Sequence, residues 1–130
     1  MLQLRNDNPT APLAPELAQP LQLLKGEHEA EALDFLSTHP LLTFVMTGWI
    51  KDNGLVSQLN RGDFYGSRNQ FGELDGVALI GHVTSFETNS ESAISAFADL
   101  TSACPSAFVV MGETRKVRRF IDYLPEGRRP

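Results

Sequence analysis

The segment that most constrains the fold runs from residue 63 to residue 87, DFYGSRNQFGELDGVALIGHVTSFE. Its β-favouring residues predict two strands, Phe64–Arg68 and Leu74–Phe86. The polar residues Asn69–Gly72 between them predict a turn. Nothing in this predicted hairpin is chemically reactive. It therefore indicates a scaffold, and the chain says more about architecture than about activity.

The second predicted strand has a continuous apolar centre, Val77–Ile80. Such a run is typical of a strand that is covered on both faces or lies at the centre of a sheet. Gly81 follows it directly and indicates either a bulge or a close approach of another stretch of backbone.

Helices and shorter strands are predicted on both sides of the hairpin. Periodic apolar spacing and capping or breaking residues indicate four helices: Glu27–Thr38, Pro40–Lys51, Asn89–Ala103 and Thr114–Leu124. Thr88 and Glu91 have the spacing of a capping box for the third helix. Two further strands are predicted, Leu21–Leu24 and Ala107–Met111, the latter of the fully buried kind. The order β–α–α–β–β(–β)–α–β–α predicts an α/β (α+β) fold with a mixed sheet, antiparallel around the hairpin, and helices on both faces.

The chain length of 130 residues fits one domain. Residues 1–20 contain four of the eight prolines and little periodic pattern, so they predict an extended or disordered lead-in. We place the single domain at residues 21–124 and a basic tail at residues 125–130. Trp49 and Tyr65 both belong to apolar patterns, so we expect them to pack in the core.

The formal net charge is −5, whereas a phosphate-binding surface needs clustered Lys and Arg. The sequence therefore predicts that the protein is not a general nucleic-acid-binding protein. The charge is uneven, however: residues 1–110 carry −8 and residues 111–130 carry +3. One interpretation of this basic end is a solvated helix face followed by the tail. The other is a docking patch for an acidic ligand, such as the phosphates of a nucleotide or coenzyme.

The single cysteine, Cys104, excludes an internal disulfide and fits a reducing cytoplasm; we expect a buried, inert thiol. No apolar run approaches the length of a membrane span, so the sequence predicts a soluble, cytoplasmic protein without a membrane partner. His28, His39 and His82 fall in different predicted elements and form no cluster with the spacing of metal ligands, so no metal site is predicted.

The strand–glycine–helix junction near the C-terminus is the one candidate for phosphate binding. Such a junction exposes backbone donors, and the basic side chains that follow add positive charge. The candidate cofactor-binding residues are Gly112, Thr114, Arg115, Lys116 and Arg119. A single glycine is far short of a phosphate loop, and Glu113 would repel an anion.

The element order, the hairpin text GELDGVALIGH and the ending SAFVVMGETRKVRRFIDYL resemble the GNAT N-acetyltransferase superfamily over about residues 21–124. The likeness is greatest to the degenerate N-terminal GNAT-like domain that precedes a catalytic GNAT domain in some two-domain bacterial proteins. The resemblance implies a GNAT-like mixed sheet. It also implies a place for acetyl-CoA, whose pyrophosphate is held in catalytic members by a glycine-rich loop between the central strand and the following helix.

This chain departs from the family pattern at that loop. The matching residues are Phe86-Glu87-Thr88-Asn89-Ser90-Glu91, with no glycine and two carboxylates where an anion should dock. The last strands of the fold, which complete the acceptor side in catalytic members, have no counterpart before Pro130. No catalytic residue can therefore be carried over from the family.

Three hypotheses follow. The first is a non-catalytic GNAT-like accessory domain that associates with a catalytic GNAT domain or with a second copy of itself. The second is an atypical acetyltransferase or a module that binds acyl-CoA or a nucleotide through a non-standard loop and the basic residues after Gly112. The third is an α/β domain unrelated to GNAT.

Overall fold

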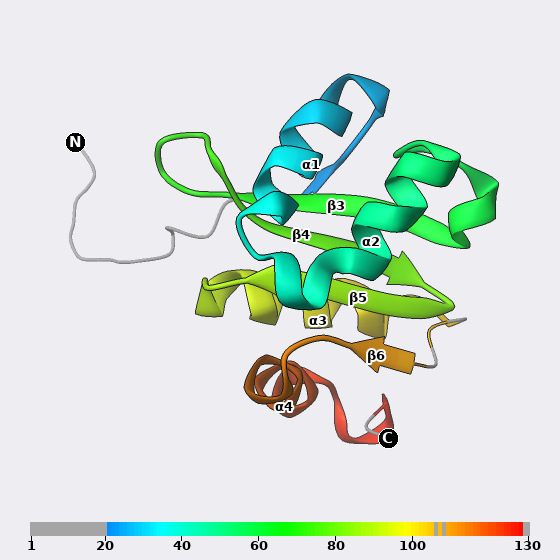
Figure 1. Cartoon of the computed structure of the whole chain (residues 1–130). Coiled ribbons are helices and arrows are strands. Elements are labelled where there is room, and N and C mark those ends of the chain that lie inside the picture. The colour runs from blue at the N-terminus through cyan, green and yellow to red at the C-terminus, as the bar shows by residue number, and fades with distance from the viewer. Residues whose placement is uncertain (1–20, 106, 108, 129–130) are drawn as a thin grey trace, which may run out of the picture.

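The computed structural model describes residues 21–105, 107 and 109–128 (Figure 1). The predicted lead-in, residues 1–20, lies outside the described residues. The strands are β2 (Gln22–Leu23), β3 (Gly62–Arg68), β4 (Leu74–Gly81), β5 (Val83–Thr88) and β6 (Val109–Met111). The α-helices are α1 (Glu29–Ser37), α2 (Pro40–Asn53), α3 (Glu91–Ser102) and α4 (Thr114–Tyr123), with short 3-10 turns at Gly26–His28, Gln58–Asn60 and Glu126–Arg128.

The strands form one mixed sheet in the order β2-β3-β4-β5-β6. Neighbouring strands are antiparallel except β5 and β6, which are parallel and are connected through α3. The helices α1 and α2 lie on one face of the sheet, and α3 lies on the other face, where α4 packs against it (Figure 1). The predicted mixed α/β fold, with antiparallel pairing at its centre and helices on both faces, is confirmed.

The centre of β4 divides the core into two layers. Val77 and Leu79 belong to the apolar cluster under α1 and α2, whereas Ala78 and Ile80 belong to the cluster under α3 and α4. All four side chains are buried. The prediction of a strand covered on both faces is therefore confirmed, since alternate side chains of one strand supply both cores.

The predicted strand Leu74–Phe86 is in fact two strands, β4 and β5, which form a hairpin around His82. The predicted close approach at Gly81 is confirmed: a Cβ atom built there would lie 2.1 Å from the carbonyl oxygen of Arg61. A Cβ atom at Gly62, opposite, would lie 2.5 Å from the carbonyl oxygen of Ile80. The two glycines let the backbones of β3 and β4 approach here, and the chain then reverses.

The start of α3 differs from the predicted capping box. The N-cap is Ser90, whose Oγ accepts a hydrogen bond from the backbone N–H of Ala93 (3.2 Å). Thr88 stays at the end of β5, where its Oγ1 donates to the carbonyl oxygen of Asp75 (2.6 Å) and accepts from the N–H of Ser90 (2.9 Å). The hydroxyl of Thr88 is used to connect two strands and the helix, so it is not available as the cap.

The prediction that β6 is fully buried is wrong. Val109 and Met111 are 47% and 40% exposed, while Val110 between them packs against the core under α3 and α4. The register places Val109 and Met111 beside Val83 and Ser85 of β5, on the sheet face that α1 and α2 cover elsewhere. Because β6 is the last strand of the sheet and α2 packs against β5, this face of β6 is left open.

Candidate functional site

The candidate cofactor-binding residues lie at the junction of β6 and α4. The helix N-terminus is already capped: the Glu113 carboxylate accepts hydrogen bonds from the backbone N–H groups of Arg115 (3.1 Å) and Lys116 (3.2 Å). Both hydrogen bonds lower the pKa of Glu113, and the bond from the Arg115 backbone has the larger effect. The donors that would hold a phosphate at this helix N-terminus are thus occupied by a carboxylate of the chain itself.

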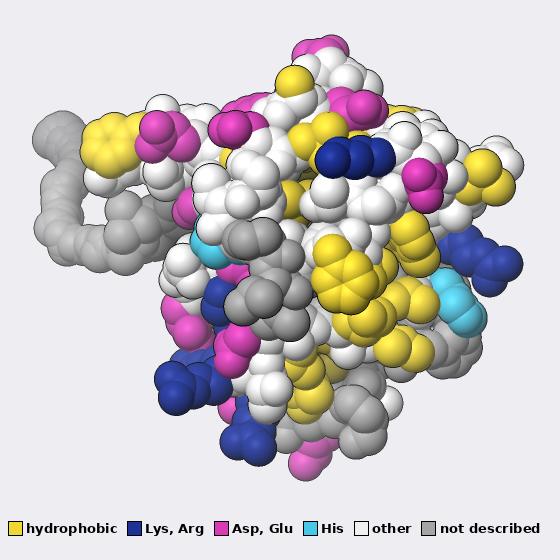
Figure 2. Space-filling model, viewed as in Figure 1, with side chains coloured by type: hydrophobic (Ala, Val, Ile, Leu, Met, Phe, Trp, Pro, Cys, Tyr) yellow, Lys and Arg dark blue, Asp and Glu magenta, His cyan; other side chains and the backbone are white. Residues whose placement is uncertain are grey.

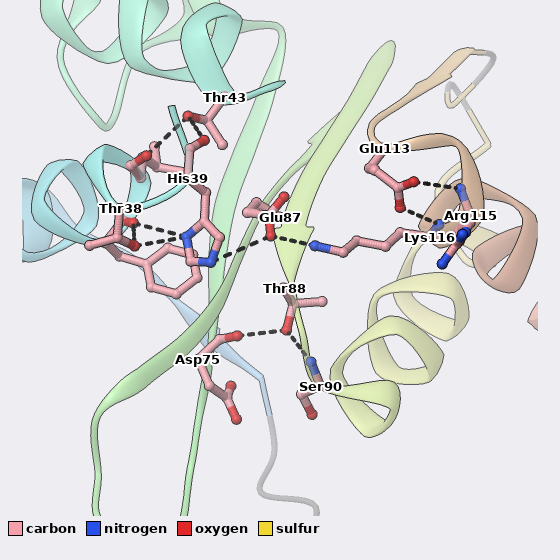
Figure 3. A network of polar contacts seen from close by, with 12 residues as sticks. Thr38, His39, Thr43, Asp75, Glu87, Thr88, Ser90, Glu113, Arg115 and Lys116 are labelled. Atoms are coloured by element: carbon pink, nitrogen blue, oxygen red, sulfur yellow. Dashed lines mark hydrogen bonds and ion pairs between the residues drawn. The ribbon is translucent and has the colours of Figure 1, made fainter. Parts of the chain in front are cut away.

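The basic side chain of Lys116, on α4, reaches back to the β5–α3 junction (Figure 3). Lys116 Nζ lies 2.7 Å from Glu87 Oε2, and the Glu87 side chain is only 4% exposed. The same carboxylate oxygen is 3.8 Å from Nε2 of His39, the residue that precedes α2. Glu87 is therefore a buried carboxylate that ties β5 to α4 and faces the corner between α1 and α2.

Arg119 makes the second connection. Its guanidinium donates two hydrogen bonds to Glu91 Oε2, from Nη2 at 2.6 Å and from Nε at 3.0 Å, and the Tyr123 hydroxyl donates to the same oxygen. The hydrogen bond from Arg119, followed by that from Tyr123, lowers the pKa of Glu91. The hydrogen bond to Glu91 in turn raises the pKa of Arg119. Half of each side chain in this pair remains exposed, so it is a surface contact.

These contacts change the meaning of the basic C-terminal end. Lys116 and Arg119 are paired with Glu87 and Glu91, the two carboxylates at the β5–α3 junction. Arg115, in contrast, is exposed, and its side chain has no ion pair among those that the structure gives for the described residues. The sequence shows the two carboxylates but not their partners, because 29 residues separate Glu87 from Lys116.

An apolar groove lies next to this junction, between α2, the β5–β6 edge of the sheet and α4. Its volume is about 410 Å³, and its lining residues are Phe44, Val45, Ser85, Val110, Met111, Gly112, Thr114, Val117 and Arg118. Gly112 and Thr114 are the two candidate residues in this lining. Arg115, Lys116 and Arg119 are not among the lining residues.

The groove continues into an exposed hydrophobic surface. Phe44 is 69% exposed, and the half-exposed side chains of Val109 and Met111 lie on the same face of the sheet. Figure 2 shows hydrophobic side chains gathered on this face of the molecule. Phe44 was not predicted as a functional residue, because Phe44 lies outside the apolar stripe of its helix. Its position as an aromatic residue on the polar side of a helix is the sequence signal that could have identified it.

The structure also tests the burial predicted for Cys104, Trp49 and Tyr65. Cys104 is half-buried and packs against the core under α3 and α4, so it is less enclosed than expected. Trp49 and Tyr65 pack against the two core clusters, as predicted.

Within residues 21–105, 107 and 109–128, no three His, Cys, Asp or Glu side chains are arranged to hold a metal ion. Within the same ranges, every helix is too short or too polar to cross a bilayer.

Comparison of the chain with protein-family models, with curated proteins and with solved structures gave no significant match.

Proposed function

We propose that this chain is a non-catalytic GNAT-like accessory domain, which binds a catalytic GNAT domain or a second copy of itself. The observation that supports the proposal most is the arrangement of charges at the β5–α3 junction. In the family that the sequence resembles, this junction holds the pyrophosphate of acetyl-CoA. Here it carries Glu87 and Glu91, and each is paired with a basic residue of α4.

This arrangement disfavours an anionic ligand in two ways. A phosphate at the start of α3 would meet two carboxylates, and the first turn of that helix is capped by Ser90. The nearest cations, Lys116 and Arg119, would have to leave their partners first. Breaking the Lys116 contact would also leave the buried carboxylate of Glu87 without its strongest partner, which is costly in a site shielded from water.

The apolar groove supports the second half of the proposal, the binding of a protein partner. Exposed aromatic and aliphatic side chains, here Phe44, Val109 and Met111, are typical of the centre of a protein interface. The groove lies on an edge strand, which offers unpaired backbone groups to a further strand. A partner that covered this face would bury the same side of β6 that the helices α1 and α2 leave open.

The test is to measure association with and without a charge in the groove. We expect light scattering to show concentration-dependent self-association, or titration calorimetry to show binding to a catalytic GNAT domain from the same host. Phe44→Asp should weaken that association at least tenfold, as expected for a central aromatic contact. The matched control is Leu59→Asp, an equally exposed position at 73% on the turn after α2. A chain that stays monomeric and binds no such domain would refute the proposal.

A second candidate function is the binding of an acyl-CoA compound without catalysis or with weak catalysis. One observation favours it: Gly112 and Thr114 line an apolar groove whose volume lies in the range of small-molecule sites. In this case an acyl chain would occupy the groove, and Arg118 at its rim would meet a phosphate. Titration with acetyl-CoA and with a long-chain acyl-CoA distinguishes this candidate, since only a groove-binding ligand would gain affinity with chain length.

A further inference from the structure

Asp75 lies at an irregularity in the sheet, on the strand next to the β5–α3 junction. On β3, Ser67 pairs with Gly76 and Arg68 pairs with Leu74, so Asp75 is the extra residue of a β-bulge in β4. Bulges redirect a side chain and are frequent beside functional sites. The backbone here is held in place, because the carbonyl oxygen of Asp75 accepts the hydrogen bond from Thr88 Oγ1.

The carboxylate of Asp75 lacks the partners that such a group normally has. Its Oδ1 is buried and has no hydrogen-bond donor among the described residues. In Figure 3 the side chain points away from the pair formed by Glu87 and Lys116. A carboxylate oxygen that is held away from water without a donor destabilises the fold, and a ligand that supplied the donor would remove this cost.

The neighbouring cations are engaged with other carboxylates. Arg68, at the end of β3 opposite the bulge, donates two hydrogen bonds to the Glu31 carboxylate. It also donates to Gln22 Oε1 and to the carbonyl oxygen of Gly72. On the other side, Lys116 and Arg119 are paired with Glu87 and Glu91. The positive charge that would balance Asp75 is therefore not supplied by these three side chains.

A hollow of about 370 Å³ lies beside the bulge, and Asp75 is among its lining residues. It is lined by Phe35, His39, Asn69, Asp75, Asn89 and Ser90, with no Lys or Arg among them. The rings of Phe35 and His39 lie 5.2 Å apart and form an aromatic wall. Asn69, Asn89 and Ser90 add neutral polar groups to the lining. The hollow thus combines one carboxylate, aromatic faces and neutral polar groups.

We propose that this hollow binds a small organic cation that carries N–H donors, an ammonium or a guanidinium group, with Asp75 as its counter-ion. N–H donors would form charge-assisted hydrogen bonds with the carboxylate, and the aromatic wall would pack against the cation. The chemistry differs from that of the apolar groove, and the proposal does not depend on the accessory-domain function.

The experiment follows backbone amide signals by NMR while three salts are added at constant ionic strength: ethylammonium chloride, guanidinium chloride and tetramethylammonium chloride. The last carries a positive charge but no N–H donor. We expect saturable shifts at Asp75, Asn89 and Ser90 with ethylammonium or guanidinium and much weaker ones with tetramethylammonium, which can contact the aromatic rings but cannot donate to the carboxylate. Whichever of the first two binds identifies the cationic group. Equal responses to all three salts would mean general charge screening and would overturn the proposal.

Variants at the carboxylate complete the test. Asp75→Asn should weaken binding at least tenfold, while Asp63→Asn, at an exposed carboxylate on β3, should leave it unchanged. Because the structure gives Asp75 no side-chain hydrogen bond to a described residue, we expect Asp75→Asn to fold, which the dispersion of the same spectra reports; Asp75→Ala serves if it does not. Binding that survives both substitutions would contradict the assignment.

Discussion

The central strand and one edge strand of the sheet differ in how their faces are covered. At β4, helices cover both faces, and alternate side chains are buried in two separate cores. At β6, the face towards α3 and α4 is packed, but the opposite face exposes Val109 and Met111 beside the apolar groove. Burial on both faces of β4 stabilises the fold, whereas the open face of β6 leaves apolar side chains exposed.

The same contrast holds for charge. Over β4, the interior is apolar and takes its order from packing. At the β5–α3 junction, in contrast, a buried carboxylate and basic side chains of α4 connect elements that are distant in the sequence. Packing specifies the centre of the molecule, whereas ion pairs specify how α4 lies against the sheet edge.

The largest expected effect is the difference in the free energy of unfolding between a variant in the closed core and a variant in the open groove. Phe97→Ala removes a completely buried ring of α3 and should lower the free energy of unfolding by about 3–5 kcal/mol. Phe44→Ala, at a side chain that is 69% exposed in the groove, should lower it by less than about 0.5 kcal/mol. Urea denaturation measures both. Similar losses would mean that the groove residue belongs to the core and that the contrast is false.

A second experiment tests the close approach of β3 and β4. Gly81→Ala places a Cβ atom 2.1 Å from the Arg61 carbonyl oxygen, so the backbones must separate, and we expect a loss of about 2–3 kcal/mol. Gly127→Ala is the control, since a Cβ atom there meets nothing within 4 Å. Thermal denaturation should show the difference, and a Gly81 variant as stable as the control would exclude the close approach.

The third prediction concerns the ion pair at the sheet edge. Lys116→Met keeps the aliphatic stem but leaves the buried Glu87 carboxylate without its cation; we expect a loss of about 2 kcal/mol, below the value for fully buried pairs because Lys116 is partly exposed. Arg115→Met, one position earlier and on the exposed side of α4, should change stability little. The double variant Lys116→Met with Glu87→Gln should recover part of the loss, and no recovery would argue against direct pairing.

The smallest effect is the acid sensitivity of the Arg119–Glu91 contact. The lowered pKa of Glu91 means that its ionised form stabilises the fold. This contribution is present above the ordinary glutamate pKa of 4.5 and is lost as the pH falls through the lowered value. Since the pair is half-exposed, Arg119→Ala should lower the free energy of unfolding only slightly at pH 7 and not at all at low pH. A loss that persists at low pH would show that Arg119 acts through packing.

Much of this architecture could be predicted from the sequence, because apolar periodicity and turn residues are local signals. The helices, the turn after Arg68 and the two-sided burial of Val77–Ile80 all follow from such signals. The exposure of β6 could not be predicted in this way. A short apolar run has the same pattern at a buried position and at a sheet edge, and only the strand order distinguishes the two.

The candidate site was less accessible to prediction. The basic residues of α4 were visible, but their pairing with Glu87 and Glu91 depends on the packing of α4 against the sheet edge, which no local pattern encodes. Thr88 and Ser90 compete for the same cap, and the choice between them is made by the hydrogen bond from Thr88 to Asp75 on the neighbouring strand. The groove and the bulge at Asp75 likewise depend on contacts between distant segments.

The most direct test of the account is a calorimetric titration of acetyl-CoA into the purified chain at low salt, repeated at high salt. If the carboxylates at the β5–α3 junction exclude the coenzyme, no binding heat should appear at either salt concentration. Binding that weakens with salt, and weakens further in Lys116→Met and Arg119→Ala, would contradict the account, because the basic residues of α4 would then be holding phosphates.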